Sequence, residues 1–434
     1  MQKLNQEILK LAVPNIISNL SVPLLSVVDI ALMGHLEYEH YILAVGFGAV
    51  IFNFLYWGFG FLRMGTTGFT AQAYGNNNFE ESFLILSRGM AVALVGGLLL
   101  ITFQYPLLKL SLLLIGAKGE VAASLIDYYH ARILAAPAIL SFFVIIGWFL
   151  GMQNSRIPMI LIVLVNLTNI GANFFFVEYL GMKAEGVAWG TVIAQYIGLL
   201  VGVFFVLKDH RQLFDFWNLS KIFNLQALKK FFSVNIDIIL RTLCLIFAFS
   251  FFKVQSSYLG SIIGAANIVL LEFITIAAYG IDGFAFAAES ISGKYFGARD
   301  EKKLKSSILY LFIWGLGTGV LFIMVFSFFG NEILHLLTDQ EPVFTKASEY
   351  LIWLIISPLA MIAPFIWDGV YIGVTASKAM RNSMMIATFL FFLPAFYLFK
   401  ALYGNHGIWL AFIIFFLARG VVQSILAKKV IYRF

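Results

Sequence analysis

The chain of 434 residues is 61% hydrophobic and only 12% charged, and its mean hydropathy is +0.90. About a quarter of the residues in a soluble globular protein are charged, so this composition excludes a soluble globular protein. The net charge of +6 requires no nucleic-acid partner, because membrane proteins concentrate Lys and Arg in their cytoplasmic loops.

Apolar runs of about 20 residues recur along the whole chain, and each is long enough to span a bilayer. We predict an all-α integral membrane protein with twelve transmembrane helices. Their ranges are 11–34, 42–73, 83–105, 121–150, 158–178, 187–207, 231–256, 262–290, 306–329, 346–374, 384–402 and 408–427.

The longest polar stretch runs from Lys208 to Lys230 and divides the spans into two groups of six. We therefore predict an N-terminal six-helix lobe at 1–207, a cytoplasmic linker at 208–230 and a C-terminal six-helix lobe at 231–434. Aromatic residues among the bases of the linker fit an amphipathic segment on the inner leaflet. A plain solvated linker is the alternative interpretation.

An even number of spans places both ends of the chain on one side of the membrane. With both termini in the cytoplasm, most of the 29 Lys and Arg fall on the inner side, as membrane proteins prefer. The cations left in outer positions are Lys109, Lys118, Arg132, Lys183, Lys253, Lys346 and Lys400. We predict a multi-pass protein of the cytoplasmic (inner) cell membrane.

The two halves of the chain repeat each other. An offset of about 222 residues superposes TAQAYG (70–75) on SGKYFG (292–297) and Tyr128 on Tyr350. Because each half has an even number of spans, the two copies enter the membrane in the same orientation. Paired repeats of this kind are typical of transporters that open alternately to either side of the membrane.

The candidate functional residues of the first half are polar groups inside apolar spans. Asp29 is an acid in the first span, where a carboxylate costs about 2.5–3.5 kcal/mol, so its presence favours a function. A side chain that reaches the membrane interface is the alternative. On the fifth span Asn166, Asn169 and Asn173 share one helical face. On the sixth span, Thr191 and Gln195 also share one helical face. Tyr128 lies at the beginning of the fourth span, one turn before Arg132. These residues either line a cavity with Asp29 or only hold helices together.

The second half is charged differently. Asp237 and Arg241 lie four residues apart in the seventh span, so we predict that they pair with each other. Glu272 and Asp282 lie in the eighth span and Asp368 in the tenth. Asp282 and Asp368 are secondary candidates for a functional acid, with a packing contact as the alternative.

The sequence contains no enzyme motif. The six His are not spaced as helical metal ligands, and there is no GxxxxGK[ST] nucleotide-binding loop. We therefore expect no enzymatic activity, cofactor or bound metal apart from the coupling ion. Transport would then be powered by an ion gradient or by a partner.

Several segments resemble the multidrug and toxic compound extrusion (MATE) transporters. VDIALMGHL (28–36) and LRMGTTGFTAQAYG (62–75) are similar to the opening signature of that family. The segments similar to its DinF-like branch are VNIDIILRTL (234–243), GIDGFAFAAESISGKYFGA (280–298) and WDGVYIG (367–373). The resemblance implies two pseudo-symmetric six-helix bundles and a secondary active multidrug antiporter.

The resemblance also implies a site. Its ion-coupling residues correspond to Asp29, Asn169, Asn173 and Thr191. Tyr128, Asn166 and Gln195 are our candidates for the substrate cavity, from the polar helical faces described above. Related proteins often have an acid where this chain has Asn173, so H⁺ is favoured over Na⁺ as the coupling ion, although Na⁺ at the Asp29 cluster stays open. The expected partners are amphiphilic, often cationic drugs or toxic compounds and membrane lipid, and we expect a monomer.

Two other functions remain open. A lipid-linked precursor flippase of the same superfamily would have a similar number of spans but would line its cleft with several Arg. An integral membrane enzyme would need a cluster of His or acidic residues at helical spacing, which the sequence lacks.

Overall fold

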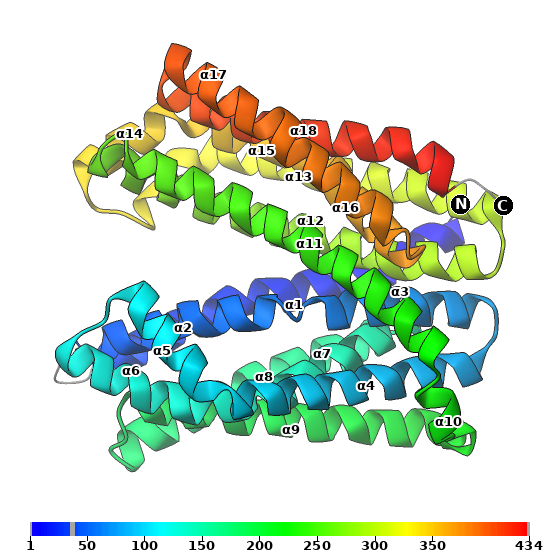
Figure 1. Ribbon diagram of the computed structural model, residues 1–434. Coiled ribbons are helices and arrows are strands. Elements are labelled where there is room, and N and C mark those ends of the chain that lie inside the picture. The colour runs from blue at the N-terminus through cyan, green and yellow to red at the C-terminus, as the bar shows by residue number, and fades with distance from the viewer. Residues whose placement is uncertain (1, 35–39, 432–434) are drawn as a thin grey trace. The chain divides into compact units, whose positions relative to one another are not determined.

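The computed structural model describes residues 2–34 and 40–431, apart from the side chains of residues 22–31, 33 and 34. Every regular element in these ranges is helical (Figure 1). Eleven helical spans of the described residues are long and apolar enough to cross a membrane, and they coincide with the second to twelfth predicted spans. Helix α1 (Gln2–Gly34) covers the range predicted for the first. The predicted all-α membrane fold is confirmed.

The chain divides into two compact units, residues 17–229 and residues 1–16 with 230–434. The first unit contains the later part of α1 and the following helices in chain order: α2 (His40–Trp57), α3 (Phe61–Gly75), α4 (Phe79–Thr102), α5 (Gln104–Ile115), α6 (Gly119–Arg132), η1 (Ile133–Ala135), α7 (Ala136–Gly151), α8 (Arg156–Phe174), η2 (Phe175–Tyr179), α9 (Ala184–His210), η3 (Arg211–Phe216) and α10 (Leu219–Ile222). The predicted lobe boundaries at 207 and 230 stay predictions.

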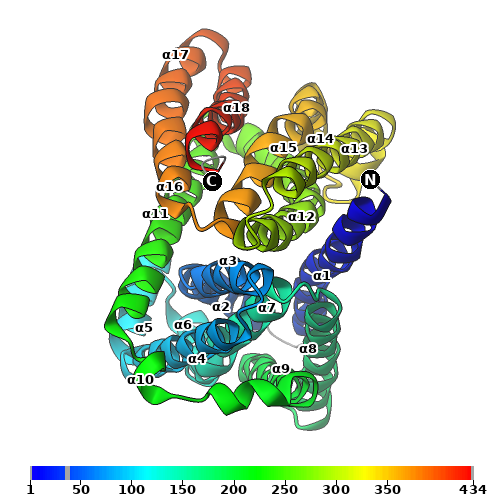
Figure 2. The ribbon, with the colours of Figure 1, turned by 90° about the vertical axis from the view of Figure 1, so that its right-hand side faces the viewer.

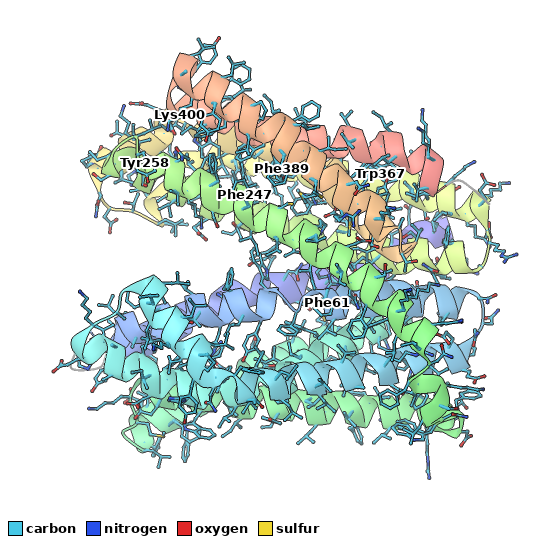
Figure 3. The ribbon with its side chains drawn as sticks, viewed as in Figure 1. Phe61, Phe247, Tyr258, Trp367, Phe389 and Lys400 are labelled. Atoms are coloured by element: carbon cyan, nitrogen blue, oxygen red, sulfur yellow. The ribbon has the colours of Figure 1, made fainter. Side chains whose placement is uncertain are left out.

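The second unit contains the start of α1 and nearly all of α11. Its helices in chain order are α11 (Leu225–Ser257), α12 (Ser261–Gly297), α13 (Glu301–His335), α14 (Glu341–Glu349), α15 (Leu351–Gly373), α16 (Ser377–Ile386), η4 (Ala387–Phe392), α17 (Leu393–Tyr403) and α18 (Asn405–Val430). Helices α12, α13 and α15 pack on one another (Figure 2). Aromatic contacts link α11 to η4, where the rings of Phe247 and Phe389 lie 6.1 Å apart (Figure 3).

The two units start equivalent helices with equivalent caps. The Asn78 side chain accepts the backbone N–H of Glu81 at 2.9 Å and caps α4, while the Asp300 side chain accepts that of Lys303 at 3.0 Å and caps α13. Both capping residues have φ −94° and ψ 81°, and the offset of 222 residues relates one to the other. Such side-chain caps satisfy N–H groups that the first helical turn leaves unpaired. The internal repeat is therefore present in local backbone geometry.

The repeat also extends to helix packing. In the first unit, a Cβ added to Gly147 of α7 would lie 2.4 Å from the Arg63 carbonyl oxygen of α3. In the second unit, a Cβ added to Gly369 of α15 would lie 2.2 Å from the Ala285 carbonyl oxygen of α12. The same offset of 222 residues relates both glycines and both partners. Each unit thus uses a glycine to bring the backbones of two spans into close approach, as membrane helices commonly do.

The segment between the two groups of spans is bound to α4 of the first unit. Arg88 is buried and donates to the carbonyl oxygens of Ile222 at 3.2 Å and Lys221 at 3.0 Å, and it pairs with Glu81 at 2.7 Å. Lys221 in turn pairs with Glu80 at 2.6 Å. These bonds satisfy the carbonyl groups at the end of α10. The end of α10 is therefore attached to α4, and the choice between an amphipathic and a solvated linker stays a prediction.

The first turns of α1 pack within the second unit. Glu7 accepts hydrogen bonds from the Tyr295 hydroxyl at 2.7 Å and Lys294 Nζ at 3.3 Å, both from α12. Asn5 accepts a hydrogen bond of 3.1 Å from Trp314 Nε1 of α13. The helix that carries Asp29 therefore begins among the helices of the second unit.

Candidate functional site

Three polar side chains of the first unit meet between α8 and α9. Asn169 Nδ2 donates a hydrogen bond of 2.9 Å to Thr191 Oγ1, and Asn173 Nδ2 donates one of 3.0 Å to Asn169 Oδ1. All three residues are buried. We call them the Asn–Thr cluster. Polar groups in a membrane interior must find partners within the protein, which explains why this stripe of α8 faces inward. The structure brings together three of the four residues predicted for the ion site, and their role stays a prediction.

A glycine makes room for this cluster. A Cβ added to Gly190 of α9 would lie 1.9 Å from Asn173 Oδ1 and 2.9 Å from the Asn173 backbone nitrogen. No real Cβ approaches another atom this closely, so α8 and α9 could not keep their separation with a larger residue there. Gly190 immediately precedes Thr191, and its small size therefore sets the distance across which Asn169 reaches the threonine hydroxyl.

Gly190→Ala is expected to push α9 away from Asn173 and to destabilise the protein by about 1–3 kcal/mol, the usual cost of overpacking. Thermal unfolding of the detergent-solubilised chain measures this loss. Gly171→Ala on α8 is the matched control, because a Cβ there meets nothing within 4 Å. Alanine also favours a helix over glycine, so the control should unfold at the wild-type temperature or slightly above it. Equal losses in both variants would contradict the role given to Gly190.

Arg132 joins the Asn–Thr cluster from α6. Its Nη1 donates hydrogen bonds to the Tyr128 hydroxyl at 2.7 Å and to Thr191 Oγ1 at 3.1 Å. Its guanidinium group lies 5.5 Å from the centre of the Phe52 ring of α2 and 5.6 Å from that of Tyr128. A Cβ on Gly48 would lie 2.3 Å from the Tyr128 ring, so this glycine makes room for the tyrosine.

The sequence places Arg132 among the cations in outer positions, and the structure adds that its side chain contacts Tyr128 and Thr191. Arg132 is half-buried inside the continuous span Gly119–Gly151, about 20 Å along the helix from its start at 1.5 Å per residue. The signal was available, because Tyr128 and Arg132 are four residues apart and therefore share a helical face. A count of charges on each side of the membrane does not take this four-residue spacing into account.

The remaining predicted residues of the first half differ in their contacts. Asn166 Nδ2 donates a hydrogen bond of 2.9 Å to Ser21 Oγ and so joins α8 to α1. Gln195 Oε1 is buried and accepts no hydrogen bond from any residue that the structure describes. The side chain of Asp29, the acid on which the prediction is centred, lies outside the described part of the structure.

In the second unit, Asp237 and Arg241 do not pair with each other, and that prediction is wrong. Arg381 Nη1 donates to Asp237 Oδ1 at 2.5 Å, and Ser377 Oγ donates to Asp237 Oδ2 at 2.8 Å. Arg241 pairs instead with Asp368 of α15. Successive turns of one helix bring two side chains near each other, but partners on α15 and α16 lie closer to their charged ends.

Asp368 is the centre of a buried ion-pair network. It pairs with both Arg241 and Arg419 and accepts a hydrogen bond of 2.6 Å from Gln423 Nε2. These four residues are all buried. Through these contacts Asp368 joins α15 to α11 and α18.

The other acids of the second unit differ in exposure. Glu272 of α12 is exposed, with its carboxylate 4.0 Å from Lys253 Nζ. Asp282, also on α12, is half-buried. Across the described residues, no three His, Cys, Asp or Glu side chains are placed to hold a metal ion.

Comparison with known proteins gives consistent results. A family model described as MatE matches residues 14–175 and 238–398, one segment in each half of the chain. The chain is 37% identical over 425 residues to the DNA damage-inducible protein F of Escherichia coli (strain K12), an alignment that covers 96% of this chain and 91% of that protein. It is 26% identical over 423 residues to the multidrug resistance protein NorM of Vibrio vulnificus (strain CMCP6), covering 94% and 91%.

Solved structures share the fold. One is the outward-facing conformation of a multidrug resistance MATE family transporter of the MOP superfamily, with a TM-score of 0.88, 19% identity and coverage of 99% of this chain and 96% of that one. These likenesses confirm the predicted MATE fold of two related six-helix bundles. Because the family model matches most of the chain and the similarity to the E. coli protein spans nearly all of it, this chain belongs to the MatE family of multidrug and toxic compound extrusion transporters.

Proposed function

We propose that this protein is a secondary active exporter that moves amphiphilic, cationic organic compounds out of the cell in exchange for protons. The observation that carries the proposal is the buried Asn–Thr cluster with Arg132 inside the first unit. Polar and charged groups inside a membrane span are costly, and in transporters they mark ion pathways. The relative NorM is named a multidrug resistance protein, which supports the substrate class.

Asp29 is the proposed proton carrier, because its position along the first span matches that of Asn173 along the fifth. It follows Ser21 by eight residues, and Asn173 follows Asn166 by seven. The hydrogen bond between Ser21 and Asn166 sets the level of α1 against α8. In the predicted topology both spans run in the same direction, so a helix continued from Ser21 would bring residue 29 to the level of Asn173, about 10–12 Å further at 1.5 Å per residue.

The charges suggest how a proton would displace a cationic drug. While Asp29 is ionised, its charge offsets that of Arg132, and a cationic compound is tolerated nearby. Protonation of Asp29 leaves the guanidinium charge unbalanced, and like charges in a medium of low dielectric repel strongly. Proton entry therefore favours drug release, as antiport requires.

Unpaired polar atoms support a substrate cavity in the first unit. The hydroxyl groups of Tyr56 and Tyr129 and the Oε1 atom of Gln195 are buried and have no hydrogen-bond partner among the described residues. Buried polar groups normally have partners in the protein or in bound water. Here, water or a bound compound would supply them. The rings of Tyr56 and Tyr129 lie 5.6 Å and 5.1 Å from that of Phe52, and all three are buried in this structure.

The flippase alternative is less well supported. It calls for several Arg that are free to bind phosphate groups. Two of the buried Arg, Arg241 and Arg419, are instead both bound to Asp368. This shared carboxylate partner favours a structural role for them.

Ethidium efflux by the full-length chain tests the proposed function. Proteoliposomes are loaded with ethidium, and the proton gradient and the Na⁺ gradient are dissipated separately. We expect efflux to stop when the proton gradient is lost and to continue when only the Na⁺ gradient is lost. Efflux that persists without any gradient, or none under any gradient, would refute proton-coupled export of this compound.

The proposal also includes the membrane in which the protein lies and its orientation in that membrane. We place the protein in the cytoplasmic membrane of the cell, with both termini inside, because this choice puts most Lys and Arg on the cytoplasmic side. A single Cys introduced at Ser220 of α10 should then react with an impermeant thiol reagent only after the cells are opened. Cys244, the single native cysteine, is replaced by Ala for this measurement. Labelling of this cysteine in intact cells would show that the protein has the opposite orientation.

A further inference from the structure

Arg132 brings a permanent positive charge to the place where a coupling cation would bind. We propose that Arg132 fills the cation position of the Asn–Thr cluster and thereby makes the site selective for H⁺ against Na⁺. This inference rests on the proposed function, in which Asp29 carries the proton, and it assigns the choice of ion to a residue outside the predicted ion site.

The hydrogen bonds of Thr191 leave no oxygen lone pair for a metal ion. A threonine hydroxyl has one hydrogen to donate and two lone pairs to accept with. Thr191 Oγ1 donates to the Val187 carbonyl oxygen at 3.1 Å, and it accepts from Asn169 Nδ2 at 2.9 Å and from Arg132 Nη1 at 3.1 Å. Its capacity is therefore fully used.

Two neighbouring oxygens also accept hydrogen bonds from N–H donors. Asn169 Oδ1 accepts from Asn173 Nδ2 at 3.0 Å, and the Tyr128 hydroxyl accepts from Arg132 Nη1 at 2.7 Å. Hard cations bind through oxygen ligands. For Na⁺ to bind through Thr191 Oγ1, it would have to displace either the Asn169 amide or the Arg132 guanidinium group.

The guanidinium charge opposes a second cation directly. An ion bound to Thr191 would lie within ~5 Å of the Arg132 head group, a distance at which like charges inside a protein repel strongly. Arginine stays protonated at any physiological pH, so its charge occupies this position whether Asp29 is ionised or protonated. A proton avoids the penalty because it binds covalently to a carboxylate and needs no set of oxygen ligands.

The position of Arg132 is maintained by contacts from three helices. Tyr128 is on its own helix α6, Thr191 is on α9, and Phe52 of α2 lies under the guanidinium plane. Its Nε is buried without a hydrogen-bond partner among the described residues. A residue needed only to join α6 to α9 would gain little from a charge here, since a neutral amide could make the same two hydrogen bonds.

Thermal unfolding of the purified full-length chain in NaCl and in choline chloride, at equal pH and ionic strength, tests the inference by binding alone. The wild-type protein should unfold at the same temperature in both salts. Arg132→Gln keeps donor groups but removes the charge, and Na⁺ should raise its Tm by about 3 °C, the order of shift expected at a ligand concentration far above Kd. Arg132→Lys should restore insensitivity to Na⁺. Arg156→Gln, which removes an exposed charge at the start of α8, is the matched control and should behave as wild type.

Two results would overturn the inference: a rise in Tm that is specific to Na⁺ in the wild-type protein, or a folded Arg132→Gln protein that Na⁺ leaves unchanged. If the Arg132→Gln protein does not fold, the Asn173→Asp variant tests the inference instead. With Arg132 still present, the added carboxylate should create no Na⁺-specific stabilisation, and its appearance would refute the inference. Ethidium efflux by the same wild-type preparation tests the proposed function separately, because the salt comparison requires no transport.

Discussion

Asp368→Asn is expected to lower the free energy of unfolding by about 3–5 kcal/mol, the cost of removing one partner from a buried ion pair. Asp368 is the shared acceptor of Arg241, Arg419 and Gln423. Its loss leaves two guanidinium groups buried without their carboxylate. Because whole proteins are stable by only about 5–15 kcal/mol, such a loss should reduce both the yield of folded protein and its unfolding temperature.

The comparison variants separate this network from a general effect of removing an acid. Asp339→Asn changes an exposed aspartate of the same unit and should unfold at the wild-type temperature. Arg419→Gln should cost less than Asp368→Asn, because Asp368 then keeps Arg241 as its partner. A thermal unfolding series on detergent-solubilised protein provides all three values. If Asp368→Asn unfolds at the same temperature as Asp339→Asn, the network does not stabilise the second unit.

Asp29→Asn is expected to abolish proton-driven ethidium efflux while leaving expression and folding close to normal. Asparagine keeps the size and hydrogen-bonding capacity of the side chain but cannot carry a proton. Moving one charge across 100 mV is worth about 2.3 kcal/mol, and without a titrating group the gradient has no means of delivering that energy. Because Arg132 then lacks a counter-charge at all times, ethidium binding should weaken as well, which fluorescence polarisation measures.

Asp127→Asn is the control for that variant. Asp127 is an exposed acid in the same unit, and its loss should change neither efflux nor binding. Full proton-driven efflux by Asp29→Asn would show that Asp29 only reaches the membrane interface. The half-buried Asp282 of the other unit would then be the first carboxylate to examine, since Asp368 already has two positive partners.

Hydropathy and repetition in the sequence predicted an all-helical membrane protein with two related halves, and the resemblance of particular segments predicted the MATE fold. A span of about 20 apolar residues can satisfy its backbone in lipid only as a helix, so the positions of the spans follow from composition alone. The offset of 222 residues predicted two related halves, and the structure repeats it in the caps at Asn78 and Asp300 and in the glycine contacts of Gly147 and Gly369. Helical periodicity also predicted that Asn169 and Asn173 face the same way, because that relation is local.

The partners of charged side chains were decided only by the tertiary structure. Asp237 and Arg241 are neighbours on one helix, yet Asp237 pairs with Arg381 and Arg241 with Asp368, each from another part of the chain. The sequence counts Arg132 among the cations in outer positions but does not predict its contacts with Thr191 and Phe52. A long side chain reaches several ångströms from its backbone, and its charge pairs with whichever opposite or polar group the packing of other helices places there. Sequence spacing describes only one helix at a time, so it predicts which face a residue lies on but not the group that it meets across the bundle.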